Sequence, residues 1–173
     1  MRILGLDPGY GRTGWGVVEY LPKGNPDRQL QALEFGVMET ASADSLSVRL
    51  YELQRGIQDI IARYTPEAAL MERLFFNQST TTAAGVYQAQ GVLLAALGAA
   101  EIECLELTPG QIKQAVTGSG RAGKSAVMDM VCRLLNIKAP IRPDDAADAL
   151  AAAIAGVHTV RSRKLMQTMR GPQ

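Results

Sequence analysis

The sequence has little of the two residue types that build most zinc sites and many catalytic triads. It contains two cysteines and one histidine among 173 residues. Cys104 and Cys132 have no metal-ligand spacing with each other or with His158, so we expect two core thiols in a reducing cytosol rather than a zinc site. The lone histidine lies in a basic segment without an evident nucleophile, which argues against a Ser-His-Asp triad. Any metal site must therefore be built from oxygen ligands.

The sequence also lacks a long apolar run. A membrane-spanning helix needs about 20 apolar residues, and the best candidate, residues 92–100, is too short and contains a glycine. Residues 1–7 place an acid where a signal peptide needs its apolar centre. With 47% hydrophobic and 20% charged residues, the composition is typical of a globular protein. We therefore predict a cytoplasmic protein without a membrane partner. It would form a single domain over residues 1–160 and a basic, flexible tail over 161–173.

The net charge is also close to zero, but the charged residues are unevenly distributed along the chain. The formal net charge is +1, yet residues 108–143 contain six Lys or Arg and one Asp. Residues 157–173 add four basic residues and no acid, so the remainder of the chain is acidic. A basic C-terminal half fits an anionic polymer that is held by one surface and cut at another. The alternative is a solvated helical face followed by a disordered tail.

Hydrophobic periodicity predicts a mixed α/β fold. Five segments have the apolar pattern of strands, and the first three are joined by short turns, which favours an antiparallel arrangement. The expected strands are 3–6, 14–20, 30–39, 68–71 and 103–107. The expected helices are 45–64, 79–97, 108–116, 124–135 and 145 to about 160. Right-handed crossovers then give a mixed five-stranded sheet of order 3-2-1-4-5, with strand 2 antiparallel and helices flanking the sheet.

Four carboxylates stand out against this pattern. Asp7 and Glu72 each end an apolar strand, and in the predicted order these strands are parallel neighbours. A carboxylate at the end of a buried strand lies at the sheet edge, where it avoids burial of its charge and can meet a ligand. Asp145 and Asp148, at the start of the last helix, share one helix face. The four acids therefore predict one oxygen-only site for Mg²⁺ or Mn²⁺.

The acids of the last helix have a second explanation. Carboxylates in the first turn of a helix stabilise it by about 0.3–1 kcal/mol without any functional role. Taken alone, Asp145 and Asp148 would be explained in this way more often than as metal ligands. Their combination with Asp7 and Glu72 favours the metal site, and we assign the capping role to Asp144.

Two glycine-rich motifs resemble nucleotide-binding loops. Glycines 9, 11 and 14 have G-x-G-x-x-G spacing, but a strand follows them instead of the helix that would hold a pyrophosphate. Residues 118–125 match G-x-x-x-x-G-K-S, yet the preceding segment has a helical pattern where a P-loop follows a buried strand. We favour a loop that presents Lys113, Arg121 and Lys124 to backbone phosphates, with a P-loop as the alternative.

Five segments of the chain together resemble the RuvC family of bacterial Holliday junction resolvases. They are Ile-Leu-Gly-Leu-Asp-Pro-Gly at 3–9, Met-Glu-Arg-Leu-Phe at 71–75, Gln-Ala-Gln-Gly-Val at 88–92, Gln-Ile-Lys-Gln at 111–114 and Asp-Ala-Ala-Asp-Ala-Leu at 145–150. The likeness runs from residue 2 to about residue 158. It implies a ribonuclease-H-like fold and a homodimeric endonuclease that nicks two opposed strands of a four-way DNA junction in recombination and repair. It also implies cooperation with the RuvA–RuvB branch-migration complex.

The same resemblance implies roles for individual residues. The acids at 7, 72, 145 and 148 match the family's catalytic carboxylates, and our hypothesis is that they hold two Mg²⁺ ions, with Mn²⁺ as a substitute. Lys113 and Lys124 match its DNA-contacting lysines. Phe75 matches an aromatic residue near the junction crossover, where stacking on an unpaired base is worth about 1–3 kcal/mol. Arg73 stands where a neutral polar residue is more usual, and we expect it to add a phosphate contact.

Three other functions are compatible with parts of this pattern. An ATP-using relative of the actin and sugar-kinase fold needs a second, duplicated domain, for which 173 residues leave no room. A non-catalytic nucleic-acid-binding module has no need for four acids. A single-strand or RNA-directed nuclease is the nearest competitor, and dimerisation distinguishes it from a junction resolvase. The small residues of the helix over 83–98 suit close packing across a two-fold dimer axis.

Overall fold

The computed structural model describes residues 1–9, 11–22, 29–73 and 80–170, without the side chains of 80–82 and 170. Its strands form one five-stranded sheet of order β3-β2-β1-β4-β5. The strands are β1 (Arg2–Asp7), β2 (Arg12–Tyr20), β3 (Leu30–Glu39), β4 (Ala68–Glu72) and β5 (Glu103–Leu107). β2 is antiparallel to both β1 and β3, whereas β4 is parallel to β1 and to β5. The predicted order and the antiparallel second strand are confirmed.

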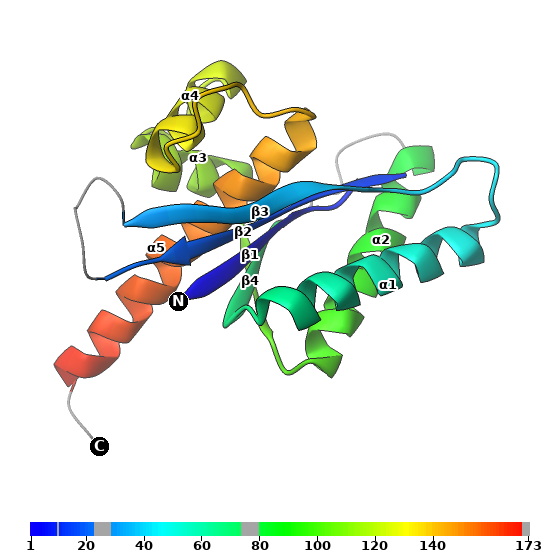
Figure 1. Cartoon of the computed structure of the whole chain (residues 1–173), viewed down its shortest axis with the longest axis horizontal. Helices are drawn as coiled ribbons and strands as arrows, with labels where there is room; N and C mark the ends of the chain where they lie inside the picture. Colours follow the sequence, from blue (N-terminus) through cyan, green and yellow to red (C-terminus); the bar gives the residue numbers. More distant parts are fainter. Residues whose placement is uncertain (10, 23–28, 74–79, 171–173) are drawn as a thin grey trace.

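Helices cover both faces of the sheet (Figure 1). They are α1 (Leu46–Tyr64), α2 (Thr80–Ala99), α3 (Pro109–Thr117), α4 (Lys124–Leu134) and α5 (Asp144–Arg170). α1 and α2 pack on one face, and α3, α4 and α5 on the other, so each face has its own hydrophobic cluster. Within the described segments, no helix is long and apolar enough to cross a bilayer.

The period-2 alternation of the central strands decides which face each side chain meets. In β1, Leu4 and Leu6 pack with α1 and α2, whereas Ile3 packs with α5. β4 repeats this alternation, with Leu70 on the α5 side. Continuing the alternation places Asp7, like Ile3, and Glu72, like Leu70, on the face that α5 covers. The strands therefore aim their terminal carboxylates toward α5.

Small residues let α5 lie directly on the sheet. A Cβ at Gly5 of β1 would come 1.9 Å from the carbonyl oxygen of Ala149, and one at Gly14 of β2 would come 2.1 Å from that of Asp145. Ala149 is itself completely buried, as is Ala153 one turn later. The alanine-rich sequence of α5 is thus explained by close backbone packing, which brings the first turns of the helix to the ends of β1 and β2.

α5 is longer than the sequence predicted. The expected end was near residue 160, with a tail beyond it, but the helix continues to Arg170. Two ion pairs hold this extension against the sheet: Arg163 Nη1 lies 2.8 Å from Glu103 Oε1, and Lys164 Nζ lies 3.0 Å from Glu67 Oε2. The extension is exposed, and its apolar side chains, Leu165, Met166 and Met169, are at least 60% exposed instead of packed in the core. The predicted helix end near residue 160 was therefore wrong, whereas the domain over residues 1–160 with a flexible tail over 161–173 stays a prediction.

Candidate active site

The four predicted acids come from three segments that meet at one edge of the sheet. Asp7 is the last residue of β1 and Glu72 the last residue of β4. The two strands are parallel neighbours, and the residues that directly precede these acids are paired in register. α5 begins at Asp144, so Asp145 and Asp148 lie in its first turns, next to the same edge. The predicted convergence of these segments is what the structure shows.

A cleft of about 270 Å³ opens at this edge. Three of the acids line it, namely Asp7, Glu72 and Asp148, together with Lys113 of α3 and Lys124 of α4. Apolar side chains from the sheet and from α3, α4 and α5 complete its walls. Acidic and basic groups therefore line the same partly apolar cleft. The acids could bind a cation, and the lysines could bind a polyanion beside it.

Burial and mutual repulsion perturb the acids at the strand ends. Burial raises the pKa of the Asp7 carboxyl to about 7, with further increases from the charges of Asp148, Glu72 and Asp145 and an opposing effect of Lys124. The pKa of Glu72 is also raised, first by burial and then by Asp148, while Lys113 opposes the increase. A group of carboxylates that cannot all ionise easily is stabilised by added positive charge.

The two acids of α5 are paired with cations. Lys124 Nζ lies 3.2 Å from Asp148 Oδ2 and 3.4 Å from Asp144 Oδ2. Arg12 Nε, at the start of β2, lies 3.0 Å from Asp145 Oδ2. We did not predict Arg12 from the sequence. The available signal was the hairpin, because the antiparallel return of β2 pairs Gly14 with Asp7 and so brings residue 12 near this edge.

The donor set fits a hard divalent cation. Four carboxylates supply only oxygen ligands, which Mg²⁺ and Mn²⁺ prefer. Within the described residues, however, no three His, Cys, Asp or Glu side chains are grouped so that they could hold one ion. Asp145 and Asp148 contact the guanidinium of Arg12 and the ammonium of Lys124 instead. An ion bound at all four acids would therefore have to compete with the positive charges of Arg12 and Lys124.

The predicted DNA-contacting residues are distributed around the cleft. Lys113 and Lys124 line it directly. Arg121 is exposed in the loop between α3 and α4. Arg73 follows β4, and its Nε lies 3.7 Å from Glu106 Oε2. Phe75 lies outside the described residues.

The glycine loop is preceded by a helix, as the sequence pattern indicated. α3 ends at Thr117, and α4 begins at Lys124. The side chain of Gln114 holds the loop, since its Nε2 donates to Gly118 O at 2.7 Å and its Oε1 accepts from the backbone N–H of Gly120 at 3.0 Å. This segment therefore lacks the strand–loop–helix context of a P-loop. Sequence reasoning missed Gln114, because its role depends on the folded path of the loop.

Comparison with known proteins identifies the family. The family model described as crossover junction endodeoxyribonuclease RuvC matches residues 3–156. This chain belongs to the RuvC family. The match includes all four acids of the candidate site.

Individual RuvC proteins are similar over nearly their whole length. The RuvC of Synechococcus sp. (strain CC9311) is 44% identical over 157 residues, which are 90% of this chain and 98% of the relative. The solved structure of Thermus thermophilus RuvC has a TM-score of 0.85 and 32% identity, over 94% of this chain and 96% of that one. A structure of the same Thermus RuvC in complex with a Holliday junction substrate has a TM-score of 0.83 and 28% identity, with the same coverage.

Proposed function

We propose that this protein is a Holliday junction resolvase, a structure-selective endonuclease that nicks two opposed strands of a four-way DNA junction in recombination and repair. One observation carries the proposal: four carboxylates from three segments meet beside a lysine-lined cleft in a chain of the RuvC family. The Thermus relative in complex with a Holliday junction substrate supports the choice of DNA.

The catalytic residues of this proposal are Asp7, Glu72, Asp145 and Asp148, which would hold two Mg²⁺ ions, with Mn²⁺ as a substitute. Bound ions of this kind activate water as a nucleophile and stabilise the departing 3′ oxygen in phosphodiester hydrolysis. The protein contributes the arrangement of the acids, since β4 pairs with β1 and α5 packs closely on β1 at Gly5 and on β2 at Gly14. Because burial and the other acids raise the pKa of Asp7 to about 7, positive charge bound in the cleft would favour its ionised form.

Basic residues of the cleft would hold the DNA backbone. Lys113 and Lys124 flank the carboxylates and supply point charges for phosphates on either side of the scissile bond. Arg121 and Arg73 extend the basic surface from the loop before α4 and from the end of β4. Phe75 would stack on a base at the junction crossover. These contacts give affinity for the backbone, and the junction's shape gives selectivity.

Paired nicks on opposed strands need two active sites related by two-fold symmetry, so we propose a homodimer. The surface of α2 supports this assembly. Its inner face is buried at Ala89, Leu93 and Ala96, whereas Gly91 and Leu94 are exposed. Small residues on an exposed helix face allow close approach of a second copy. A cytoplasmic location, one domain over residues 1–160, and cooperation with a RuvA–RuvB complex belong to the same proposal.

Cleavage of synthetic DNA tests the function. A four-way junction and a linear duplex of the same sequence are incubated with the full-length protein in Mg²⁺, in Mn²⁺ or in chelator. We expect nicks only in the junction and only with metal. Asp7→Asn should abolish cleavage and leave junction binding intact or stronger, because one negative charge is lost. Asp59→Asn, at an exposed position of α1, is the matched control.

Two results would reject the proposal. Cleavage of the linear duplex as fast as the junction would favour a nuclease that has no selectivity for four-way junctions. Cleavage by Asp7→Asn at the normal rate would remove Asp7 from the catalytic residues.

A further inference from the structure

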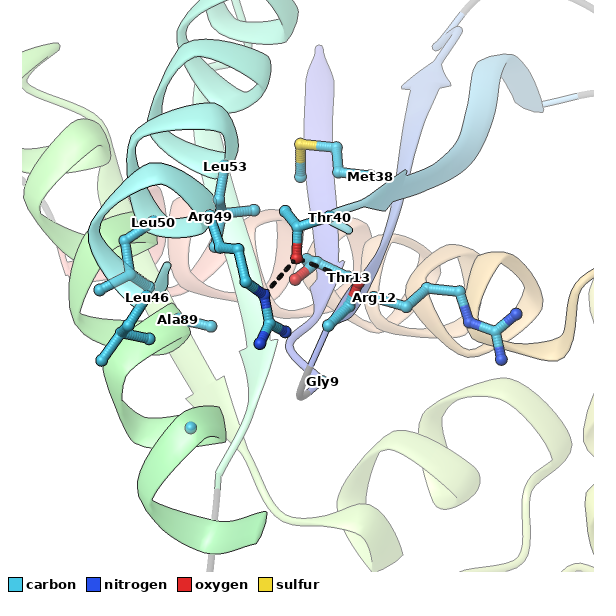
Figure 2. A pocket seen from close by; sticks show the side chains of 12 residues that line it. Gly9, Arg12, Thr13, Met38, Thr40, Leu46, Arg49, Leu50, Leu53 and Ala89 are labelled. Carbon is cyan, nitrogen blue, oxygen red and sulfur yellow. Dashed lines mark hydrogen bonds between the residues drawn. The ribbon is translucent and has the colours of Figure 1, made fainter. Parts of the chain in front are cut away.

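Arg12 joins the candidate active site to the outer strands of the sheet. Its Nε lies 3.0 Å from Asp145 Oδ2, and its Nη1 lies 3.5 Å from Glu39 Oε1 at the end of β3. Figure 2 shows its side chain extending away from the neighbouring pocket, toward α5. One guanidinium thus contacts a predicted metal ligand on one side and an exposed glutamate on the other.

The backbone before Arg12 is anchored by a separate network. The carbonyl oxygen of Gly11 accepts hydrogen bonds from the Thr40 backbone N–H at 3.0 Å and from Thr40 Oγ1 at 3.4 Å. Arg49 Nε of α1 donates to the same hydroxyl at 3.0 Å (Figure 2). Gly11 has a φ of +90°, a conformation that favours glycine. β3 and α1 therefore fix the base of Arg12, and its guanidinium reaches Asp145 from a defined point.

The pair between Arg12 and Asp145 is accessible to solvent. The Arg12 side chain is 48% exposed and that of Asp145 is 30% exposed. Exposed ion pairs contribute little to stability, so this one can break without a large loss. The carboxylate that accepts from Arg12 is also one that a divalent ion held by the four acids would use.

We propose that Arg12 is a positioning residue that holds Asp145 in the metal-free protein and competes with the divalent ion for this carboxylate. The inference rests on the proposed metal-dependent function. Arg12 places a positive charge beside Asp145, and that charge would oppose the binding of a cation at the same carboxylate. Glu39 acts in the opposite direction, because it draws the same guanidinium away from Asp145.

Metal affinity measured without DNA tests this competition. Mn²⁺ is titrated into the chelator-treated, full-length protein, and the free ion is quantified by electron paramagnetic resonance. We expect Arg12→Gln to bind Mn²⁺ about two- to five-fold more tightly, the size expected for loss of one exposed ion pair. Glu39→Gln should bind more weakly, because Arg12 then pairs with Asp145 alone. Arg55→Gln and Glu52→Gln, at exposed positions of α1, make the same charge changes and serve as controls.

The outcomes separate this inference from the proposed function. Opposite changes in affinity for Arg12→Gln and Glu39→Gln, beyond those of the controls, support the competition. Unchanged or weaker binding by Arg12→Gln overturns it, and so do shifts of the same sign in both variants. Asp145→Asn is titrated in parallel. If it loses Mn²⁺ affinity while Arg12→Gln changes nothing, only the inference fails. If it keeps full affinity, Asp145 is not a metal ligand, and both fail.

Discussion

Among single residues, the four carboxylates differ in how their charges are neutralised. Asp145 and Asp148 each form an ion pair with a cationic side chain, Asp145 with Arg12 and Asp148 with Lys124. Asp7 is instead held at the buried end of β1, where the other three acids add to the effect of burial. One local environment therefore contains two kinds of acid, which differ in the charges that lie next to them.

The raised pKa of Asp7 predicts how pH affects the stability of the metal-free protein. Between the ordinary value of 3.8 and the folded value of about 7, the folded state binds more protons than the unfolded state. Stability therefore falls as pH rises through this window. We expect Asp7→Asn to raise the melting temperature at pH 8 by about 3 °C or more and to have little effect near pH 4. Thermal unfolding in chelator measures this, and an equal effect at both pH values would contradict it.

Lys113 should contribute to DNA affinity through charge alone. Lys113→Ala is expected to weaken junction binding and to reduce the slope of log affinity against log salt by about one. Lys138→Ala, at an exposed position beyond α4, removes an equal charge away from the cleft and should change the slope less. Fluorescence anisotropy at several salt concentrations makes the comparison. Equal slopes for the two variants would exclude Lys113 from the interface.

Among the elements, the contact between β1 and α5 decides the geometry of the site. Both elements contribute acids, and they meet through glycine and alanine with almost no side chain between the backbones. α5 also spans the sheet and continues to Arg170. Within this last part, Arg163 forms an ion pair with Glu103 of β5, and Lys164 forms one with Glu67, which precedes β4. Any displacement of this helix would move Asp145 and Asp148 relative to Asp7.

Gly5→Ala should therefore be strongly destabilising. The new Cβ would lie 1.9 Å from Ala149 O and 2.5 Å from Ala153 N, and neither backbone atom can turn aside. We expect a loss of roughly 3 kcal/mol or more in the free energy of unfolding, measured in urea. Gly56→Ala is the matched control, since its Cβ meets the flexible end of Met38. A loss below about 1 kcal/mol for Gly5→Ala would show that α5 can shift.

For the whole molecule, the proposed function depends on two copies acting on one junction. The cleft lies at one edge of the sheet, so a single copy presents one set of acids. The exposed face of α2 is the surface that we assign to the second copy. It includes Gly91 and Gly98, where an added Cβ would meet nothing within 4 Å in the single chain.

A charge on this face should separate the copies. Leu94 is 38% exposed, and Leu94→Glu would place a carboxylate opposite its own symmetry mate. We expect a monomer by light scattering after gel filtration, and single nicks where the original protein makes paired ones. Gln58→Glu, at an exposed position of α1, adds the same charge elsewhere. A dimer that persists in Leu94→Glu would place the interface on another surface.

Much of this molecule was predictable because its signals are local. Strand alternation and helical periodicity gave the sheet order, since right-handed crossovers allow few others. The same patterns placed Asp7 and Glu72 at strand ends and Asp145 and Asp148 on one helix face. The end of α5 was missed because its last turns are held by ion pairs with distant segments rather than by an apolar stripe.

The sequence by itself determined which acids converge, because each follows from the period of its own element and from the chain's order. Only the tertiary structure decided which cation each acid meets. Arg12 reaches Asp145 across more than a hundred residues of sequence, and Lys124 reaches Asp148 from another helix. Such pairings depend on distances of a few ångströms between elements. The periodicity of side chains along the sequence carries no information about those distances. The geometry of charge around the carboxylates is therefore a property of the packed fold.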